Sequence, residues 1–488
     1  MAVDINKLKQ FIATLSGEEQ VWLNGYLTAM VAGGSSVSSG GSNIPKTKLT
    51  IFYGTETGNS KQLASDLANS FNQASFQVKT QDLEIYKAVK LAKETKAIFI
   101  ISTHGEGEFP ESVKGFFEEL GIKKPNLKKL DYALIALGDS SYPLYCQSGK
   151  DLDALLLEFG ASNIIPRADL DLDYNDHING WVQSFIAKAG SGDVAPVITV
   201  ATSDKVDLHK VYQGEILANI NLSDDGSNVE IRHIEISSDE EIVFRPGDSL
   251  SLALNPEDEY VKSVGHKEEK IAPRLYSIAS SPEYHDGEVH LTVRVAYHID
   301  ENGQEGTGLC SGYLASLAEG SNIEFTIKPN NQFRLPDHSL EQDIILIGPG
   351  TGVAPFRSFL ADRAANSSPG RNWLFFGAQH FHSDFLYQTE IQDFVSQGLL
   401  SKVSLAFSRD QEHKIYVQDR MSEEEEELFS WIKGGAIIYV CGDKDHMAKD
   451  VENTLLNIIG KYAHLDADGA KEYLYNMKQD NRYLKDVY

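Results

Sequence analysis

Runs of apolar residues alternate with helical patterns in the first half of the chain. From residue 48 onward, the segments LTIFYG, AIFIIS and ALIALG are apolar for four or five residues, and sequences with helical spacing follow at 60–71, 113–120 and 149–159. Strands that are apolar throughout and are separated by helices are typical of a parallel sheet buried on both faces. The pattern predicts a doubly wound α/β domain that ends near Ala189.

The pattern changes twice in the second half. Residues 211–336 read as short alternating strands broken by turns such as Arg245-Pro-Gly-Asp248, which favours an antiparallel barrel. From Asp343 the α/β alternation returns in DIILIGPG, NWLFFG, KVSLAFS and AIIYVCG, which predicts a second parallel-sheet domain. The predicted fold class is therefore α/β and β multidomain.

The N-terminal region predicts two short amphipathic helices between residues 5 and 31, interrupted at Ser16 and Gly17. They suit equally a helical cap on the next domain and an element for docking or homo-oligomerisation. The stretch GGSSVSSGGS that follows predicts a flexible tether. The predicted division is a helical segment at 1–32, a linker at 33–46, an α/β domain at 47–190, a linker at 191–204, a barrel at 205–338 and a last domain at 339–488.

Composition and charge exclude several classes of protein. The 488 residues are 41% hydrophobic, enough for more than one core, and the net charge of -27 argues against nucleic acid or an anionic membrane as partner. Most of that charge, a net of -23, lies in residues 191–488. The three cysteines lack disulfide or metal-ligand spacing, and no export signal or membrane-length apolar run is evident, so we expect reduced thiols, no metal and a cytoplasmic location.

Loops rich in hydroxyl groups and glycine follow three strands of the first domain. Thr55-Glu-Thr-Gly-Asn-Ser60 leads into a helix, and such a turn can bind phosphate through backbone N-H groups and the helix dipole. It lacks the lysine of a nucleoside-triphosphatase loop, and taken alone it fits an N-capped turn equally well. Ser102-Thr-His-Gly-Glu-Gly107 and Leu137-Gly-Asp-Ser-Ser-Tyr142 follow the next two strands, where the ligand crevice of a parallel sheet lies.

These three loops resemble flavodoxin over residues 48–189, which implies bound FMN. The resemblance implies phosphate contacts from Thr55, Glu56, Thr57, Gly58 and Asn59. The flavin ring would be enclosed by Ser102, Thr103, His104, Gly105, Gly107, Leu137, Gly138, Asp139, Tyr142, Tyr145 and Cys146. Tyr142 would stack on the ring, and His104 stands where some relatives have a stacking tyrosine.

Two segments of the barrel carry a second set of candidate ligands. Arg274 and Tyr276 share one side of a strand, where they could grip a pyrophosphate and cover a flavin, although an arginine on a barrel is usually a solvated rim residue. A glycine turn at Gly308 opens the helix that follows. The two segments resemble ferredoxin-NADP reductases, which implies FAD bound between Arg274, Leu275, Tyr276 and Ser277 on one side and Gly308, Leu309, Cys310 and Ser311 on the other.

The last domain predicts a site for a phosphorylated nicotinamide nucleotide. Its loop Gly348-Pro-Gly-Thr-Gly352 lacks the spacing of the dinucleotide fingerprint, so it is weak evidence by itself. Between Ser408 and Gln418, hydrogen-bond donors are concentrated in this otherwise acidic domain, as recognition of a 2'-phosphate would require. A surface cluster of ion pairs would look similar. The candidate NADPH ligands are Gly350, Thr351, Gly352, Ser408, Arg409, Lys414, Tyr416, which could stack on adenine, Gln418 and Asp443.

The resemblance to these reductases also implies a site of hydride transfer. It matches a Ser, a Cys and a C-terminal acidic residue to Ser277, Cys441 and Asp486, and a terminal aromatic residue over the FAD ring to Tyr488. Without the resemblance, a lone buried cysteine is more often a small apolar side chain.

An acidic run at 423–427 could be mistaken for a partner site. It follows Ser422 and precedes LFSWI, so we predict instead that Ser422 caps a helix with an acidic first turn.

Taken together, the chain resembles the diflavin reductases, and among them the sulfite reductase flavoproteins, through CQSGKDLD, RLYSIASS, NWLFFG, YVQD, VCGD and RYLKDVY. The family implies electron flow from NADPH through FAD to FMN and on to a haem or iron-sulfur acceptor, here a sulfite reductase haemoprotein of assimilatory sulfite reduction. Relatives insert a helical connecting module before RLYS, whereas only residues 257–272 stand there in this chain.

Two alternatives follow from the sequence. The short connection suits a compact reductase for a haem monooxygenase or another redox partner, and the N-terminal helices would also suit a non-catalytic scaffold with vestigial flavin sites. The presence of Ser277, Cys441, Asp486 and Tyr488 weighs against the scaffold.

Overall fold

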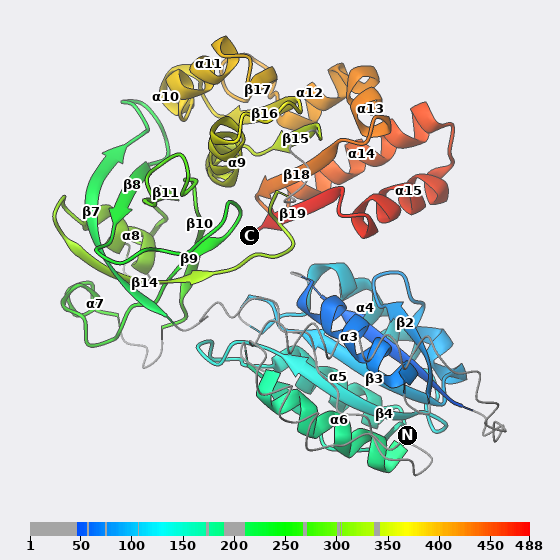
Figure 1. Cartoon of the computed structure of the whole chain (residues 1–488). Coiled ribbons are helices and arrows are strands. Elements are labelled where there is room, and N and C mark those ends of the chain that lie inside the picture. The colour runs from blue at the N-terminus through cyan, green and yellow to red at the C-terminus, as the bar shows by residue number, and fades with distance from the viewer. Residues whose placement is uncertain are drawn as a thin grey trace, which may run out of the picture. The chain divides into compact units, whose positions relative to one another are not determined.

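The computed structural model describes residues 46–55, 58–73, 76–105, 107–171, 175–189, 210–266, 271–299, 303, 305–335 and 342–488 (Figure 1). The predicted N-terminal helices, the tether at 33–42 and the linker at 191–204 lie outside these residues, as do Glu56 and Thr57 of the first loop.

The first domain is built on a parallel sheet in the order β2-β1-β3-β4-β5, with β6 also paired to β4. Its strands are β1 (Thr47–Gly54), β2 (Phe76–Asp82), β3 (Lys96–Ser102), β4 (Asp131–Leu137), β5 (Ser162–Asn163) and β6 (Ala168–Leu170). Its helices are α3 (Asn59–Gln73), α4 (Lys114–Lys123), α5 (Gln147–Glu158) and α6 (Asn175–Ala189), with two short turns, η1 (Ala88–Lys93) and η2 (Glu111–Val113). The predicted strands and helices are confirmed to within one helical turn.

Helices cover both faces of this sheet. One core packs α3 and α6 against one face, and a second packs α4 and α5 against the other. Because each face is buried, the central strands lose their polar alternation, and residues 97–101 of β3 are all fully buried. The ligand crevice of such a sheet lies at the carboxyl ends of its strands, so the loops that follow the strands form it.

The middle domain is an antiparallel sheet in the order β10-β9-β14-β7-β8-β11, with a separate hairpin of β12 and β13. Its strands are β7 (Val211–Asn221), β8 (Ile231–Ser237), β9 (Ser249–Leu252), β10 (Arg274–Ser277), β11 (Val289–Arg294), β12 (Tyr297–Ile299), β13 (Glu305–Thr307) and β14 (Asn322–Lys328). Helices α7 (Glu259–Ser263) and α8 (Leu309–Ser316) complete it. Alternate residues of the strands fill one apolar core, which agrees with the predicted barrel.

The last domain is a parallel sheet in the order β17-β16-β15-β18-β19. Its strands are β15 (Ile344–Ile347), β16 (Asn372–Ala378), β17 (Leu400–Phe407), β18 (Ile437–Gly442) and β19 (Tyr483–Val487). Its helices are α9 (Ala354–Ala365), α10 (Phe381–Asp384), α11 (Gln388–Ser396), α12 (Val417–Glu423), α13 (Glu425–Lys433), α14 (Met447–Ala463) and α15 (Ala467–Gln479), and the turn η3 (Gly350–Val353) precedes α9. The four predicted strands are confirmed, and β19 is an addition.

The barrel and the last domain share a hydrophobic core. Phe333, which follows β14, is fully buried, and its ring centroid lies 5.7 Å from that of Phe359 on α9 and 5.5 Å from that of Tyr439 on β18. Ile231 of β8 belongs to the same cluster. These two domains therefore form one packed module.

The predicted cap at Ser422 is wrong. Ser422 lies inside α12, where its hydroxyl donates to the carbonyl of Gln418, and α13 begins only at Glu425. The acidic first turn itself is confirmed, because Glu425, Glu426 and Glu427 occupy the first turn of α13. The sequence pattern located the charges correctly but placed the start of the helix before Glu425, in a segment that belongs to α12.

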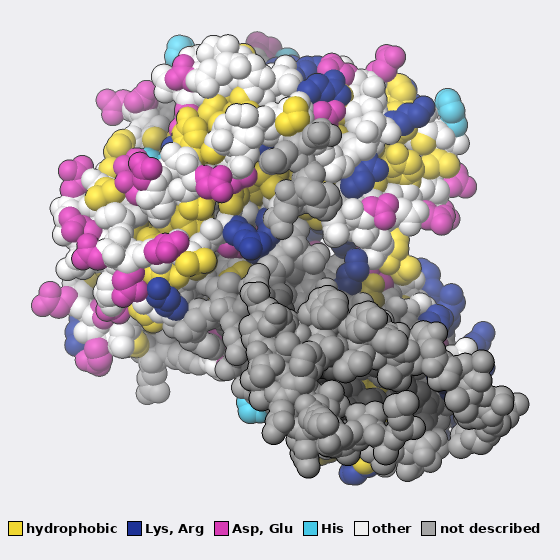
Figure 2. All heavy atoms as spheres, viewed as in Figure 1, with side chains coloured by type: hydrophobic (Ala, Val, Ile, Leu, Met, Phe, Trp, Pro, Cys, Tyr) yellow, Lys and Arg dark blue, Asp and Glu magenta, His cyan; other side chains and the backbone are white. Residues whose placement is uncertain are grey.

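Acidic side chains are spread over the described surface that Figure 2 shows, with lysines and arginines between them. In the part of the chain that the structure describes, no helix combines the length and the apolar character needed to cross a membrane.

Candidate functional site

The three glycine and hydroxyl loops of the first domain follow β1, β3 and β4, which are neighbours in the sheet. In the first loop, the backbone N-H of Gly58 donates to the hydroxyl of Thr55 over 2.8 Å, and Gly58 has a φ of 83°, a left-handed conformation that favours glycine. The hydroxyls of Ser60 and Thr103 are buried and lack a hydrogen-bond partner among the described residues. Buried hydroxyls without a partner among the described residues, at the end of a parallel sheet, fit an anionic ligand such as the FMN phosphate.

Ser60 was not among the predicted ligands, although it ends the loop at 55–60. The signal was available, because a hydroxyl in the first turn of a helix can reach a bound phosphate.

The third loop combines exposed and deeply buried candidates. Cys146 is fully buried, and its thiol donates to the carbonyl of Ala136 over 3.4 Å, so it supports the loop from the core side. A Cβ on Gly138 would lie 2.9 Å from the backbone nitrogen of Cys146, which explains the glycine there. Tyr142 and Asp139 belong to the turn above, where the N-H of Tyr142 donates to the Asp139 carbonyl.

The proposed FAD ligands of the barrel lie on two adjacent segments. Strand β10 pairs with β9, with Arg274 opposite Leu252 and Ser277 opposite Ser249, and Arg274 is exposed. Gly308 precedes α8, and Ser311 accepts the N-H of Ala296. The two other predicted ligands of this turn pack into the barrel: Cys310 is buried in its core, and Leu309 is partly buried against it.

The glycine loop of the last domain fits close to strand β18. Gly350 has a φ of 56°, and a Cβ on Gly352 would lie 2.1 Å from the carbonyl oxygen of Cys441. Only glycine permits this approach, which holds the loop and the N-terminus of α9 beside the end of β18.

The predicted 2'-phosphate ligands follow β17. The backbone N-H groups of Ser408 and Arg409 donate to the carbonyls of Ala378 and Gln379, which fixes the start of the loop. The side chains of Arg409 and Lys414 are exposed and form no ion pair with a described residue. Two unpaired cations in a strongly acidic domain suit an anionic ligand.

Two other predicted NADPH ligands already have partners, and a third is exposed. Gln418 donates to Asp450 over 3.2 Å, and Asp443 accepts the N-H groups of His446 and Met447 at the start of α14. Burial acts to raise the pKa of Asp443, but these N-H donors hold it below its usual value. Tyr416 is 42% exposed and available for stacking.

Ser277, Cys441 and Asp486 meet where the barrel joins the last domain. The hydroxyl of Ser277 donates to Oδ2 of Asp486 over 2.8 Å, and Sγ of Cys441 lies 4.0 Å from the same oxygen. Cys441 and Asp486 are direct neighbours in the register of β18 with β19. Three segments that are far apart in the sequence thus bring a hydroxyl, a thiol and a carboxylate together.

The surroundings of this triad shift its acidities. Burial, and then the negative charge of Asp486, raise the pKa of the Cys441 thiol well above its usual value, so the thiol stays protonated. Burial also raises the pKa of Asp486, and the hydrogen bond from Ser277 opposes that rise. The site therefore holds a carboxylate that titrates closer to neutral pH than an exposed one.

Tyr488 has a fixed backbone and an exposed ring. Its N-H donates to the carbonyl of Gly442, its own carbonyl accepts from Lys444, and its hydroxyl lies 3.1 Å from that of Thr351. The side chain is nevertheless 62% exposed. An exposed aromatic ring held beside the triad can cover a flat ligand such as a flavin.

Comparison with known proteins agrees with this arrangement. Residues 51–181 match the Flavodoxin family, residues 267–313 match the FAD binding domain, and residues 346–453 match the Oxidoreductase NAD-binding domain. The sulfite reductase [NADPH] flavoprotein alpha-component of Bacillus subtilis is 35% identical, with 99% of this chain and 97% of the relative aligned. Those of Neisseria meningitidis and of a Shewanella species are 34% and 32% identical over the same shares. The chain belongs to the sulfite reductase flavoprotein family.

Membership of the family confirms the predicted fold class, the enzyme class of NADPH-dependent flavoprotein oxidoreductase, and the cofactor set of FMN, FAD and NADPH. The alignment with the Bacillus relative extends over 590 positions, whereas this chain has 488 residues, so the relative has roughly a hundred residues that this one lacks. The predicted short connection at 257–272 contains, in its described residues, only the five-residue helix α7.

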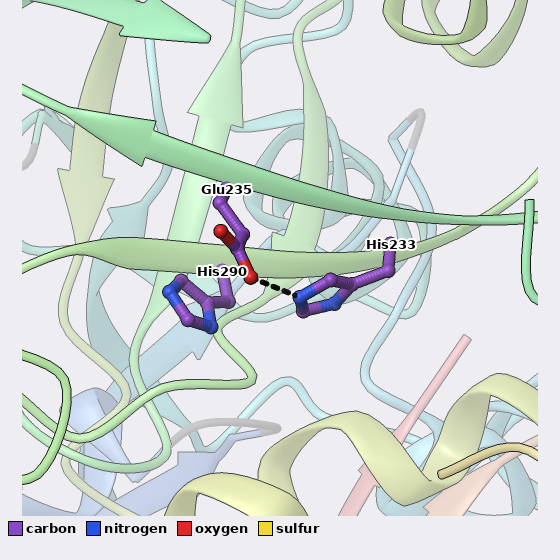
Figure 3. Close-up of side chains that lie close together, drawn as sticks. All are labelled: His233, Glu235 and His290. Carbon is purple, nitrogen blue, oxygen red and sulfur yellow. Dashed lines mark hydrogen bonds and ion pairs between the residues drawn. The ribbon is translucent and has the colours of Figure 1, made fainter. Parts of the chain in front are cut away.

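A cluster of polar side chains that the sequence analysis missed lies in the barrel. His233 and Glu235 on β8 and His290 on β11 face one another, with His290 directly opposite Glu235 in the register (Figure 3). Their possible ligand atoms lie within 4.8 Å of one another. Residues on different strands gave no local spacing signal, which explains the omission.

Hydrogen bonds account for this cluster without an ion. Arg357 of α9 donates to Nδ1 of His290 over 3.0 Å, so the neutral ring carries its proton on Nε2 and donates to Glu288. His233 can likewise donate from Nε2 to Glu235 and accept from Tyr387 through Nδ1. A cation would have to displace these protons beside the positive charge of Arg357.

The pKa values of these histidines are low for the same reasons. Burial, and then the charge of Arg357, lower the pKa of His290 to about 2 and that of His285, whose ring centroid lies 4.6 Å from that of His290, to about 4. Both rings therefore remain neutral at neutral pH.

Helix α9 also forms hydrogen bonds with the segment that follows strand β10. Arg357 donates to the carbonyl of Ala279 over 2.8 Å, and Ser358 donates to the carbonyl of Ser280 over 2.6 Å. The hydroxyl of Ser281 donates to Asp362. This set of bonds, which we call the α9 clamp, begins two residues after Ser277 and fixes the barrel against the last domain.

Replacing Arg357 with methionine should destabilise the reductase module. The substitution leaves Glu390, the Ala279 carbonyl and His290 without their shared donor, and we expect a loss of about 2–3 kcal/mol in the free energy of unfolding, because Glu390 keeps some contact with water. Arg371→Met is the matched control, since Arg371 pairs with Asp343 at the surface and its loss should cost about 1 kcal/mol or less. Equal denaturation midpoints for the two variants would contradict the clamp.

Proposed function

We propose that this chain oxidises NADPH and supplies electrons to a sulfite reductase haemoprotein. The observation that carries the proposal is the alignment with sulfite reductase [NADPH] flavoprotein alpha-components over 97% of their length. The three candidate cofactor sites support it, because bound FAD can accept a hydride from NADPH and bound FMN can release single electrons, which a haem centre requires.

The chain's own residues would have defined tasks. The loops at Thr55–Asn59 and the hydroxyls of Ser60 and Thr103 would hold the FMN phosphate, Arg274 and the turn at Gly308 would hold FAD, and Arg409 and Lys414 would select the 2'-phosphate. Asp486 would place negative charge where the nicotinamide ring becomes positive as its hydride leaves, while the Ser277 hydroxyl holds the carboxylate.

The purified full chain, reconstituted with FAD and FMN, tests this function. NADPH oxidation is measured with a sulfite reductase haemoprotein and sulfite, with a haem monooxygenase, and with cytochrome c as a general acceptor. The proposal expects sulfide formation only with the haemoprotein. Sulfide formation that fails while cytochrome c is reduced would refute the acceptor and leave the diflavin reductase intact.

The second candidate, a compact reductase for another redox partner, is favoured by the roughly hundred residues that this chain lacks relative to the Bacillus protein. Turnover of the monooxygenase without sulfide formation would support it. A scaffold with vestigial flavin sites would oxidise NADPH with none of these acceptors.

Removing the two unpaired cations should weaken NADPH binding selectively. We expect Arg409→Ala and Lys414→Ala each to raise the KM for NADPH about ten- to a hundredfold and to leave the KM for NADH nearly unchanged, because only NADPH has the 2'-phosphate that they would bind. Lys433→Ala is the control, since this exposed lysine ends α13, before the amino end of β18. A parallel rise for NADH would show that the loop binds something other than the 2'-phosphate.

The rate of FAD reduction by NADPH should depend on the ionisation of Asp486. Because burial raises its pKa, the carboxylate is lost as the pH falls through a value above that of an exposed aspartate, and the stopped-flow rate should fall with it. Asp486→Asn should abolish this pH dependence and lower the plateau rate about ten- to a hundredfold. Asp468→Asn, at an exposed position in the first turn of α15, should change neither. A wild-type pH profile in Asp486→Asn would exclude the proposed role.

A further inference from the structure

The carboxylate of Asp486 has a second polar neighbour besides Ser277. Its Oδ2 accepts from Ser277, whereas its Oδ1 lies 3.4 Å from the side-chain nitrogen Nδ2 of Asn330, in the segment after β14. An amide nitrogen is a donor only, so this contact is a hydrogen bond at the long end of the usual range. Each carboxylate oxygen of Asp486 thus accepts a hydrogen bond from a different side chain of the barrel.

Asn330 is held in place by a buried ion pair. Its backbone N-H donates to Oδ1 of Asp248 over 2.9 Å, and its carbonyl accepts from Nε of Arg334. Arg334 in turn donates to the same oxygen of Asp248 over 2.6 Å, and Asp248 is only 3% exposed. The backbone contacts fix the turn, which leaves the Asn330 side chain directed at Asp486.

The same aspartate also holds the strand that carries Ser277. The carbonyl of Asp248 accepts the N-H of Ile278, the residue after Ser277, over 3.0 Å. Ser249, the next residue after Asp248, pairs with Ser277 in the register of β9 with β10. Both donors to Asp486 are therefore anchored at Asp248, which fixes the distance between them.

We propose that Asn330 is a positioning residue for hydride transfer. Its side chain holds the Asp486 carboxylate in the orientation in which the carboxylate contacts Ser277 and Cys441. The inference rests on the proposed role of Asp486. Two donors at fixed positions leave the carboxylate no free rotation, whereas one donor would leave it free to turn about the Ser277 contact. A purely structural asparagine would need only its backbone contacts in this turn.

Only the groups that surround Asp486 in the described residues could alter its titration directly. They are Ser277 on β10, Asn330 after β14, Cys441 on β18, whose thiol stays protonated, and Tyr488 two residues further along its own strand end, on which the charge of Arg294 acts. A change in the pH profile after substitution of Asn330 would thus report on Asp486 itself.

Asn330→Ala and Asn330→Asp test the proposal in the full reconstituted chain. We expect Asn330→Ala to slow FAD reduction at neutral pH about three- to tenfold and to leave the dissociation constant of NADPH unchanged, since the lost bond is long. The midpoint of its pH profile should move upward, because the carboxylate loses a donor. Asn330→Asp should move it further, because a second negative charge disfavours ionisation of Asp486.

Asn331→Ala is the matched control, since this neighbouring asparagine is exposed. Its rate and pH profile should equal those of the wild type. If Asn330→Ala has the wild-type profile while Asp486→Asn slows the reaction, the positioning role is refuted and the proposed site stands. If Asp486→Asn is itself without effect, the proposed site fails, independently of Asn330.

Discussion

The hydrogen bonds between helix α9 and the end of strand β10 are the constraint on which the reductase module depends. The helix begins at the glycine loop proposed for the nucleotide, and the strand end follows Ser277 directly. Because Arg357 and Ser358 bind the backbone carbonyls of Ala279 and Ser280, the strand cannot slide along the helix without losing buried bonds. The relative position of the two candidate ligand sites is therefore fixed by the side chains of Arg357 and Ser358, which donate to backbone carbonyls of the barrel.

Burial around this junction determines the protonation states. The histidines of the barrel stay neutral because they are buried beside Arg357, and the Cys441 thiol stays protonated because it is buried beside Asp486. Burial of the Asp486 carboxylate costs free energy unless hydrogen-bond donors surround it. Ser277 and Asn330 supply these donors, so the same geometry that stabilises the charge also orients it.

In the last domain, the side chains at the proposed nucleotide site matter more for binding an anionic cofactor than the net charge of the domain. The region from residue 191 onward has a net charge of -23, yet the proposed nucleotide site needs only the two exposed cations at Arg409 and Lys414. Neutral donors complete the other candidate sites, through hydroxyls such as Ser60 and Thr103 and through glycine turns that expose backbone N-H groups. A surface of this sign is compatible with anionic cofactors because the contacts are short and local.

The sequence by itself determined the three domains, the strands with continuous apolar runs and the loops at their ends, because periodicity and turn composition are local properties. It missed β19, whose half-polar sequence YLKDV lacks an apolar run, and it misplaced the cap of α13. It named Ser277, Cys441 and Asp486 only through resemblance to a family. Only the tertiary structure decided that these residues meet, that Cys146 and Cys310 face the core, and that His233, His290 and Arg357 form one network, because contacts between distant segments leave no periodic trace in the chain.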